Sequence, residues 1–297
     1  MAKLLVTGGA GFIGSVLVRQ LIDRGDEVHI TVRPGTNPDR LDTRVPKAHR
    51  HLIDGTTDSV FSAVDAARPE YVYHLASLYL RSADVSQVTP LLEANINFGV
   101  QLCEALAKRG APVRFVTFGT YSQFYRTDPP RPLDLYSALK TAFAEVLAYY
   151  ADAHAFDVVT LTIYDSYGLG DWRTKIVKVL AEATRSGNPV PLSDPGIEID
   201  LTHIEDVARA ALIAADVAVS QGDVAAFAVS GERMTLQDLV HMVEQASGRS
   251  LDARWGSYEL PKRRIMQPVT GKALPGWRPQ IALAEGLASY FRSASET

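Results

Sequence analysis

Short apolar runs alternate with longer stretches of helical periodicity over the first two thirds of this chain. A short apolar run predicts a buried strand, whereas apolar residues spaced three and four apart predict a helix with one buried face. The expected strands are residues 3–7, 27–32, 71–75, 114–118 and 157–164, and the expected helices are residues 13–24, 60–67, 88–109 and 133–153. Strands separated by such helices indicate right-handed crossovers, so we predict an α/β fold with a doubly wound parallel sheet.

The pattern changes after Ser166, where Gly and Pro gather around residues 168–170 and 187–196. Helical periodicity returns at residues 173–186, 204–217 and 236–247, and an apolar run at 225–229 predicts a short strand. We therefore expect two unequal parts. They are a sheet domain of residues 1–165, with residues 199–220 folding back onto it, and a smaller carboxyl-terminal substrate lobe of residues 166–198 and 221–297.

Composition and charge narrow the class of protein. Hydrophobic residues make up 46% of the 297 positions and charged residues 22%, which is ordinary for a folded globular protein. The net charge of −4 and the lack of a block of like charge argue against nucleic acid or a membrane surface as a partner. Cys103 is the only cysteine, so an intrachain disulfide and a thiolate metal cluster are both excluded. We find no signal peptide and no long apolar span, and expect a cytoplasmic protein without a metal centre.

A glycine-rich turn joins the first expected strand to the first expected helix. Its glycines, Gly8, Gly11 and Gly14, have the spacing G-x-x-G-x-x-G. Such glycines permit a tight turn, close approach of the backbone to a pyrophosphate, and close packing of helix against strand. The helix amino terminus adds unpaired N–H groups and a partial positive charge. We predict that these glycines, with Phe12 and Ile13, bind a dinucleotide; the alternative is a structural turn before a surface helix.

The residues after the second expected strand indicate the cofactor. NAD-binding folds usually place Asp or Glu there, about 20 residues beyond the glycines, to accept hydrogen bonds from the ribose. Here Val32 is followed by Arg33, and a guanidinium pairs well with a 2′-phosphate, so we predict NADP(H), with Arg40 closing the pocket. In the alternative, Arg33 is solvated and NAD binds without its carboxylate. Other expected cofactor-binding residues are Asp54, Gly55, Leu75, Ala76, Ser77 and Asn95, whereas His74 is expected to be packed and hydrogen-bonded.

Tyr136 and Lys140 lie four positions apart in an expected helix, so both side chains share one face. A free phenol has a pKa near 10. An ammonium about 4 Å away, at an effective dielectric of about 20, favours the phenolate by roughly 4 kcal/mol, so Lys140 should lower the pKa of Tyr136 towards neutrality. Such a phenol exchanges protons with a carbonyl or hydroxyl, and Thr120, at the carboxyl edge of the sheet, can hold the substrate oxygen. The alternative is a solvated lysine lying over an aromatic ring.

Together, Thr120, Tyr136 and Lys140 resemble the catalytic trio of the short-chain dehydrogenase/reductase superfamily. The chain is most similar to the extended nucleotide-sugar epimerase/reductase group, through Thr7-Gly8-Gly9-Ala10-Gly11-Phe12-Ile13-Gly14, His74-Leu75-Ala76, Glu93-Ala94-Asn95, Tyr136-Ser137-Ala138-Leu139-Lys140 and His203-Ile204-Glu205-Asp206-Val207-Ala208. Within that group it resembles the NDP-4-keto-6-deoxyhexose 4-ketoreductases of the CDP-paratose and CDP-abequose synthase type, through residues 119–123, 164–168, 171–175 and 274–277.

The resemblance implies a Rossmann-type fold and an enzyme that reduces the 4-keto group of an NDP-4-keto-6-deoxyhexose with NADPH in deoxysugar biosynthesis. Tyr136 would be the general acid, assisted by Thr120, and Lys140 would also hold the nicotinamide ribose. A homodimer would form through the helices expected at 88–109 and 133–153. The expected substrate contacts are Thr120, Tyr121, Asp165, Arg173, Lys175 and Arg263, of which the basic ones suit a sugar diphosphate.

Three departures from the group bear on the reaction. Tyr121 and Ser122 stand where 4,6-dehydratases carry an Asp-Glu pair, so dehydration lacks its carboxylates. Cys103 has an apolar helical spacing and is expected in the core rather than as an epimerising base. Ile199 replaces an arginine that the group often carries before Asp200. Two alternatives remain open, an NDP-sugar 4-epimerase with tightly bound NAD and a non-enzymatic NADP-sensing binding protein.

Overall fold

The computed structural model describes residues 2–80, 84–154, 156–220 and 222–293. Its largest element is a seven-stranded sheet in the order β12-β8-β5-β4-β1-β2-β3, in which every neighbouring pair is parallel. The strands are β1 (Lys3–Thr7), β2 (Glu27–Val32), β3 (Arg50–Leu52), β4 (Tyr71–His74), β5 (Val113–Thr120), β8 (Phe156–Ile163) and β12 (Val224–Val229). The predicted doubly wound parallel sheet is therefore confirmed.

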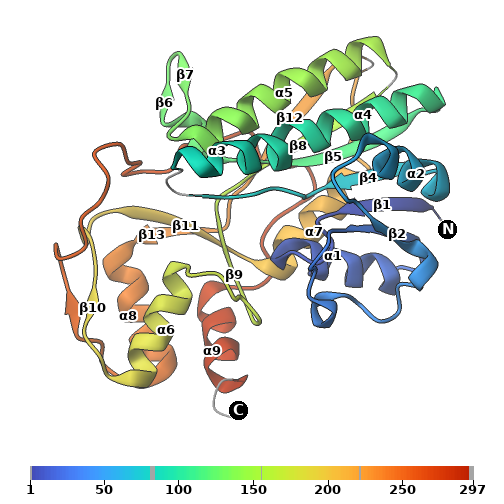
Figure 1. Cartoon of the computed structure of the whole chain (residues 1–297). Coiled ribbons are helices and arrows are strands. Elements are labelled where there is room, and N and C mark those ends of the chain that lie inside the picture. Colours follow the sequence, from blue (N-terminus) through green and yellow to red (C-terminus); the bar gives the residue numbers. More distant parts are fainter. Residues whose placement is uncertain (1, 81–83, 155, 221, 294–297) are drawn as a thin grey trace.

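Helices cover both faces of this sheet (Figure 1). The first face carries α1 (Phe12–Asp23) and α7 (Ile204–Ala214), and the second carries α2 (Thr57–Ala67), α4 (Phe98–Arg109) and α5 (Leu135–Ala153). Side chains alternate along β1, so Leu4 and Val6 enter the core beneath α1 while Leu5 enters the core beneath α2. All three are fully buried, which explains why β1 is apolar throughout. Within the described ranges, no helix has both the length and the apolarity needed to cross a membrane.

The helix expected over residues 88–109 is instead broken into three segments. After the capping residue Asp84 come α3 (Val85–Leu92), a π-helical turn η3 (Glu93–Asn97) and then α4. Pro90 lies inside α3, where it has no N–H to donate to the helix. Single π-helical turns often occur at functional positions, and this one carries the buried Asn95.

The second part of the chain builds a smaller lobe around its own core. A three-stranded sheet of β13 (Glu232–Thr235), β11 (Glu198–His203) and β9 (Asp165–Tyr167) packs with α6 (Ile176–Ser186), α8 (Leu236–Ser247) and α9 (Leu283–Ser293). Beside them, β10 (Val190–Pro191) pairs with β14 (Ala253–Arg254). The strand expected at residues 225–229 pairs with β8, so this part of the range 221–297 belongs to the large sheet and not to the lobe. Helix α7 packs against α1, on the sheet domain.

Candidate active site

The glycine-rich turn lies between β1 and α1, at the carboxyl edge of the large sheet. Gly8 has a φ of +72°, and a Cβ there would come within 2.8 Å of the Ala76 nitrogen. The Gly11 N–H donates to the Gly8 carbonyl at 2.8 Å, which closes the turn. A Cβ on Gly14 would collide with the same carbonyl oxygen. The three glycines are therefore required by close backbone approaches.

The amino terminus of α1 is open to an anion. Its N-cap, Gly11, has no side chain to bind the first N–H groups, and the first turn holds no acidic residue. Phe12 and Ile13 begin the helix directly behind the turn. The N–H groups and the helix dipole therefore point at the turn without a neutralising side chain. This backbone cradle, whose tight turn a Cβ on the glycines would not allow, fits the pyrophosphate of a dinucleotide.

The residues expected to bind the adenosine end of the cofactor lie on the surface, after β2 and β3. Arg33 is exposed and donates its backbone N–H to the Thr36 hydroxyl at 2.9 Å. Within residues 2–80, 84–154, 156–220 and 222–293, its guanidinium makes no hydrogen bond or ion pair. The exposed Asp54 accepts from the N–H and the hydroxyl of Thr56, at 2.9 and 2.6 Å, and Gly55 between them has a φ of +96°. The Arg33 side chain is thus exposed to solvent, while the Asp54 carboxylate is hydrogen-bonded within its own turn.

Trp172 brings the lobe into contact with the glycine-rich turn. Its ring meets that of Phe12 edge-on, with centroids 5.9 Å apart, and the Arg40 guanidinium carbon lies 3.9 Å from its centroid. The Arg173 guanidinium carbon lies 4.3 Å from the Phe12 centroid. The segment before α6 therefore covers the first turn of α1. Trp172 was not among the expected site residues, although it lies in the stretch 171–175 that carries the resemblance.

Buried polar groups hold the loop after β4. Thr7 and His74 end β1 and β4, and Thr7 Oγ1 lies 3.0 Å from His74 Nδ1. The Ala76 N–H donates to Thr7 Oγ1 at 3.1 Å, which sets the backbone of Leu75 and Ala76 against Gly8. Burial lowers the pKa of His74 to about 3, so its imidazole is neutral. His74 is confirmed as a packed, hydrogen-bonded histidine.

Asn95 anchors the next stretch of the same loop. From η3, its Nδ2 donates to the carbonyl oxygens of Leu78 and Leu91 at 2.9 and 3.0 Å. Its Oδ1 accepts from the Ser77 hydroxyl at 2.7 Å. Both ends of this buried amide are therefore engaged by the protein, and Asn95 positions Ser77 and Leu78 at the site.

Tyr136 and Lys140 share a face of α5, whose first turn is capped by Asp134. Lys140 is only 8% exposed, and burial lowers its pKa to about 8. Its Nζ lies 6.0 Å from the centroid of the Tyr136 ring. Burial raises the pKa of Tyr136, and a hydrogen bond with Ser77 and the charge of Lys175 oppose this only in part.

The direction of the Tyr136 pKa corrects the expectation drawn from the sequence. An ammonium about 4 Å from the phenol was expected to lower this pKa. In the structure Lys140 is not among the main influences on the Tyr136 pKa, and its own burial disfavours its charged form. Desolvation of the phenol therefore dominates, and the protein alone holds Tyr136 as a neutral proton donor.

Thr120 ends β5 at the same edge of the sheet, where the short helix η4 (Tyr121–Phe124) begins. Its Oγ1 lies 2.9 Å from Ser122 Oγ, and its N–H donates to the Gln123 side chain at 2.9 Å. The Leu133 N–H donates to the Ser122 carbonyl at 2.9 Å, which fastens η4 beside the start of α5. No hydrogen bond joins Thr120 to Tyr136 in the described part of the chain, so their action on one substrate atom stays a prediction.

An ion pair from the lobe faces Tyr136. Lys175 Nζ lies 3.1 Å from Asp165 Oδ1, and the Asp165 charge raises the pKa of Lys175. The same Nζ lies 5.2 Å from the centroid of the Tyr79 ring, which meets the Tyr136 ring edge-on at 5.0 Å. The Tyr121 hydroxyl donates to Asp165 Oδ2 at 3.5 Å. The structure thus brings Tyr121, Asp165 and Lys175 together near Tyr136 and adds Tyr79, an exposed aromatic residue that the sequence did not single out.

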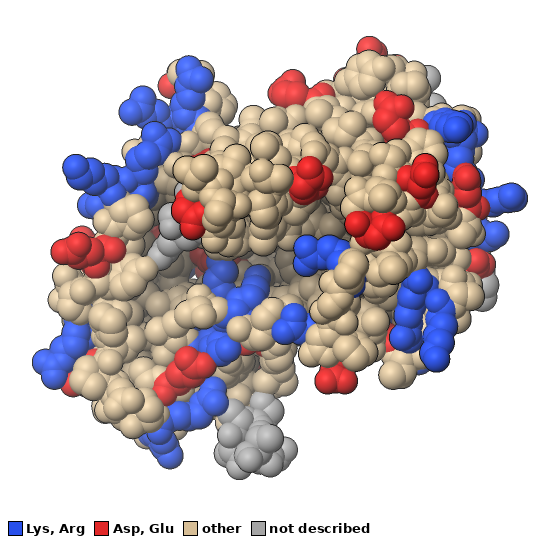
Figure 2. All heavy atoms as spheres, in the orientation of Figure 1, with Lys and Arg blue, Asp and Glu red and all other residues tan. Residues whose placement is uncertain are grey.

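Basic side chains gather in the hollow between α3 and the helices of the lobe, as Figure 2 shows. The two arginines expected to bind substrate are engaged by the protein itself. Arg173 pairs with both carboxylate oxygens of Asp171, each at 2.8 Å. Arg263 donates to the carbonyl oxygens of Leu133 and Pro132 at 2.9 and 2.7 Å, just before α5. Both guanidinium groups therefore hold loops around the site.

Asp200 forms a further charge centre in the lobe. Arg233, its partner across β11 and β13, donates to its Oδ2 at 2.9 Å. A guanidinium thus reaches this carboxylate from the neighbouring strand, although Ile199 precedes it in the chain. The Arg233 guanidinium carbon lies 5.4 Å from the Tyr164 centroid, and Tyr164 stacks on Tyr121. A cavity of about 230 Å³ opens here, lined among others by Phe124, Thr127, Thr162, Tyr164, Val269 and Lys272.

The fold and the site together define a class of protein: a parallel α/β protein with a backbone cradle that fits a dinucleotide pyrophosphate, and a half-buried Tyr beside a buried Lys at the same edge of the sheet. The chain belongs to the NAD dependent epimerase/dehydratase family, whose sequence profile matches residues 4–227. The matched range runs from β1 into β12, the last strand of the large sheet. The resemblance drawn from the sequence motifs is therefore confirmed at the level of the family.

The individual relatives include a sugar-nucleotide synthase and sugar-nucleotide epimerases by name. CDP-abequose synthase of Yersinia pseudotuberculosis is 23% identical, over 86% of this chain and 88% of the relative. UDP-glucose 4-epimerase of Corynebacterium glutamicum is 25% identical, over 94% and 91%. Among solved structures, UDP-glucose 4-epimerase of Thermus thermophilus in complex with NAD is 26% identical, with a TM-score of 0.82 over 98% of this chain and 99% of the other.

Proposed function

We propose that this chain reduces the 4-keto group of an NDP-4-keto-6-deoxyhexose with NADPH, in deoxysugar biosynthesis. One observation carries the proposal: Tyr136 is a half-buried phenol held neutral beside Ser77, which follows Ala76, the residue that borders the glycine cradle. The short helix η4 presents Tyr121 and Ser122 there instead of carboxylates. A proton donor of this kind suits reduction of a carbonyl. The similarity to CDP-abequose synthase of Yersinia pseudotuberculosis supports the same reaction type.

In this proposal the protein supplies alignment and a proton, while bound NADPH supplies the hydride. Tyr136 donates its phenolic proton to the carbonyl oxygen as negative charge develops there, and the Thr120 hydroxyl donates a hydrogen bond to the same oxygen. The buried Lys140 stabilises the phenolate that remains and holds the nicotinamide ribose. Lys175, with its partner Asp165, orients the sugar beside Tyr136. Arg173 and Arg263 hold the loops around the sugar. In this proposal the lobe, formed by residues 166–198 and the carboxyl-terminal region, therefore binds the substrate.

The choice of NADP(H) rests on Arg33, which follows β2 in place of a carboxylate. Replacing it by Ala should lower the preference for NADPH over NADH about tenfold, because a hydrogen bond to a charged group contributes about 1.5–3 kcal/mol. The measurement is kcat/KM with each cofactor. Arg254→Ala, which removes an exposed arginine of the lobe, serves as the control and should leave the preference unchanged. An unchanged preference in Arg33→Ala would assign the selectivity to another residue.

The second candidate is an NDP-sugar 4-epimerase with tightly bound NAD. The specific observation in its favour is the structural similarity to the NAD complex of the Thermus thermophilus UDP-glucose 4-epimerase. Such an enzyme restores its cofactor in every cycle, so it needs no NADPH. Protein that purifies with NAD and interconverts two sugar nucleotides without added NADPH would establish this candidate instead.

The decisive experiment supplies CDP-, dTDP- and GDP-4-keto-6-deoxyhexoses, each generated in situ, and follows the absorbance of NADPH. We expect stoichiometric consumption of NADPH with one of them and formation of an NDP-6-deoxyhexose. NADPH binding without consumption on the whole panel would support the non-enzymatic, NADP-sensing alternative. We further propose that the protein is cytoplasmic and forms a homodimer through α4 and α5. Sedimentation of the purified protein tests whether it is a dimer.

A further inference from the structure

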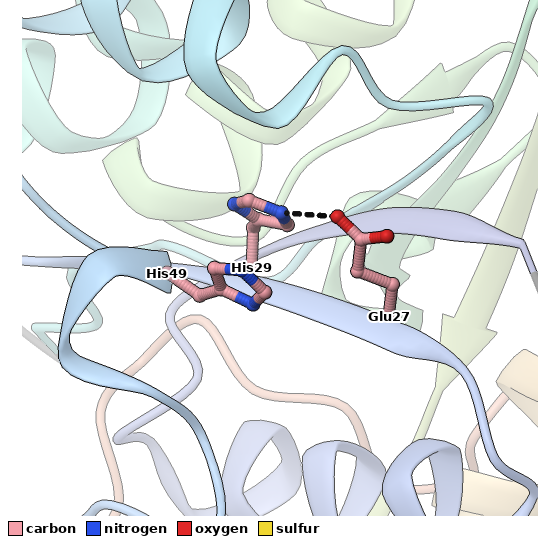
Figure 3. Close-up of side chains that lie close together, drawn as sticks. All are labelled: Glu27, His29 and His49. Atoms are coloured by element: carbon pink, nitrogen blue, oxygen red, sulfur yellow. Dashed lines mark hydrogen bonds and ion pairs between the residues drawn. The ribbon is translucent and has the colours of Figure 1, made fainter.

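A cluster of histidines with one glutamate lies at the outer edge of the large sheet (Figure 3). Glu27 and His29 are two positions apart on β2, so their side chains share one face. Val28 and Ile30 point to the opposite face, into the core beneath α1. His49, on the short helix η2 (Lys47–His49), stacks on His29 with ring centroids 3.9 Å apart. Three side chains that commonly bind metals therefore converge from two segments of the chain.

The ligand atoms lie close enough to surround one ion after a small movement. One atom from each of Glu27, His29 and His49 lies within 4.8 Å of the other two, and His29 Nε2 is 3.1 Å from Glu27 Oε1. Tetrahedral zinc ligands, with bonds of about 2.0–2.1 Å, lie about 3.4 Å apart. The Glu27–His29 distance therefore needs little change. The His49 ring, which is only partly buried, has to turn out of its stack to bring a nitrogen to the ion.

His51, on β3, supports His29 from its other side. His29 Nδ1 lies 2.8 Å from His51 Nε2. A metal-bound imidazole usually donates its second N–H to a neighbouring acceptor, which fixes the ring and strengthens the ligand. With Nε2 of His29 on an ion, its Nδ1–H would donate to His51.

We propose that Glu27, His29 and His49 bind a divalent transition-metal ion, of which Zn²⁺ suits the ligands best, with water in the fourth position. Two imidazoles and a carboxylate are ligands that Zn²⁺ accepts. The Glu27 side chain is 31% exposed, so the ion can enter from the solvent. The site lies towards the amino end of β2, whereas the glycine cradle lies at the carboxyl edge of the sheet. The ion therefore takes no part in the proposed reduction and instead ties η2 to β2.

The test uses the full chain freed of any affinity tag, dialysed against a chelator and then titrated calorimetrically with Zn²⁺. We expect one Zn²⁺ per chain and a melting temperature that rises by several degrees when Zn²⁺ is added. His49→Gln should weaken binding more than about 100-fold, because it removes a ligand, and His51→Phe should weaken it by about 10–100-fold, because it removes the supporting acceptor. His241→Gln, at an exposed histidine of α8, is the matched control and should bind as the parent does.

Melting of each variant in chelator separates loss of a ligand from loss of the fold. His49 lies on a one-turn helix at the surface, so we expect His49→Gln to melt with the parent in chelator and to lose only the rise caused by Zn²⁺. Parent protein that binds no stoichiometric Zn²⁺ would overturn the proposal and leave the cluster as a hydrogen-bonded stack. Equal affinity in His49→Gln and His241→Gln would overturn it as well.

Discussion

The cofactor side of this site is built from backbone groups, whereas the substrate side is built from side chains. The cofactor side is a backbone cradle, in which Gly8, Gly11 and Gly14 clear the space and the N–H groups of α1 face it. The substrate side consists of charged side chains that already have partners within the protein. These are Lys175 with Asp165, Arg173 with Asp171 and Arg233 with Asp200.

Backbone groups can recognise a ligand without moving, whereas paired side chains have to adjust when a ligand binds. A pyrophosphate meets N–H groups whose positions the turn determines, so no side chain has to move. In the proposed function, a sugar diphosphate would meet cations that each belong to a carboxylate, so it would have to share or displace that partner. The cofactor side is therefore set by backbone geometry, whereas the substrate side depends on how each ion pair is held. Tyr136 lies between the two sides, in contact with Ser77 and Tyr79.

The largest effect is expected where the two sides meet. Tyr136→Phe should lower turnover by about 10²–10⁴, because it removes the proton donor, while the affinity for NADPH stays nearly unchanged. Turnover is measured with the 4-keto sugar nucleotide that the parent accepts, and affinity by quenching of the protein fluorescence. Turnover within a few-fold of the parent would contradict the role of Tyr136.

The next effect concerns the cradle. Gly8→Ala should weaken NADPH binding at least about tenfold, because its Cβ would press on the Ala76 nitrogen that borders the cradle. Gly25→Ala is the matched control, since Gly25 also has a positive φ, of +87°, but among the described residues beyond its chain neighbours no atom lies within 4 Å of the added Cβ. Both variants carry about 1–2 kcal/mol of backbone strain, so both should melt earlier. Equal NADPH affinity in the two variants would show that the cradle tolerates a side chain.

A smaller effect should appear on the substrate side. Lys175→Gln should raise the KM for the sugar nucleotide about tenfold without changing the affinity for NADPH, because it removes a charged hydrogen bond. Asp165→Asn keeps the cation and should raise KM less. Lys178→Gln, in the neighbouring α6, is the control. If Lys175→Gln and Asp165→Asn only lower the melting temperature, and by the same amount, then the ion pair is structural.

The smallest effect concerns stability. Burial lowers the pKa of Lys140 from 10.5 to about 8, so the unfolded chain binds more protons than the folded one between these values, and stability rises with pH there. Between pH 8 and 9, the free energy of unfolding of the cofactor-free protein should rise by about 1 kcal/mol relative to Lys140→Met. Denaturant unfolding at several pH values measures this difference. Parallel pH profiles of parent and variant would show that Lys140 is not desolvated.

Much of the fold follows from local pattern. The strand at residues 27–32 and the helix at 236–247 have the predicted bounds, because hydrophobic periodicity and capping residues act over a few positions. The break at η3 was missed, although Pro90 signalled it, because the apolar spacing continues across the turn. Strand β9 was missed because it has only three residues, and β11 because the buried Asp200 interrupts its apolar positions.

The sequence by itself determined the parallel sheet, the glycine cradle and the shared face of Tyr136 and Lys140, since each depends on neighbours within one element or one turn. Tertiary structure alone decided which charges are paired, as Arg233 reaches Asp200 from 33 positions away. It also decided the direction of the Tyr136 pKa and brought His29 and His49 together without any motif. The reason is common to all of these: burial and Coulomb interactions depend on distance in space, which residue spacing along the chain does not record.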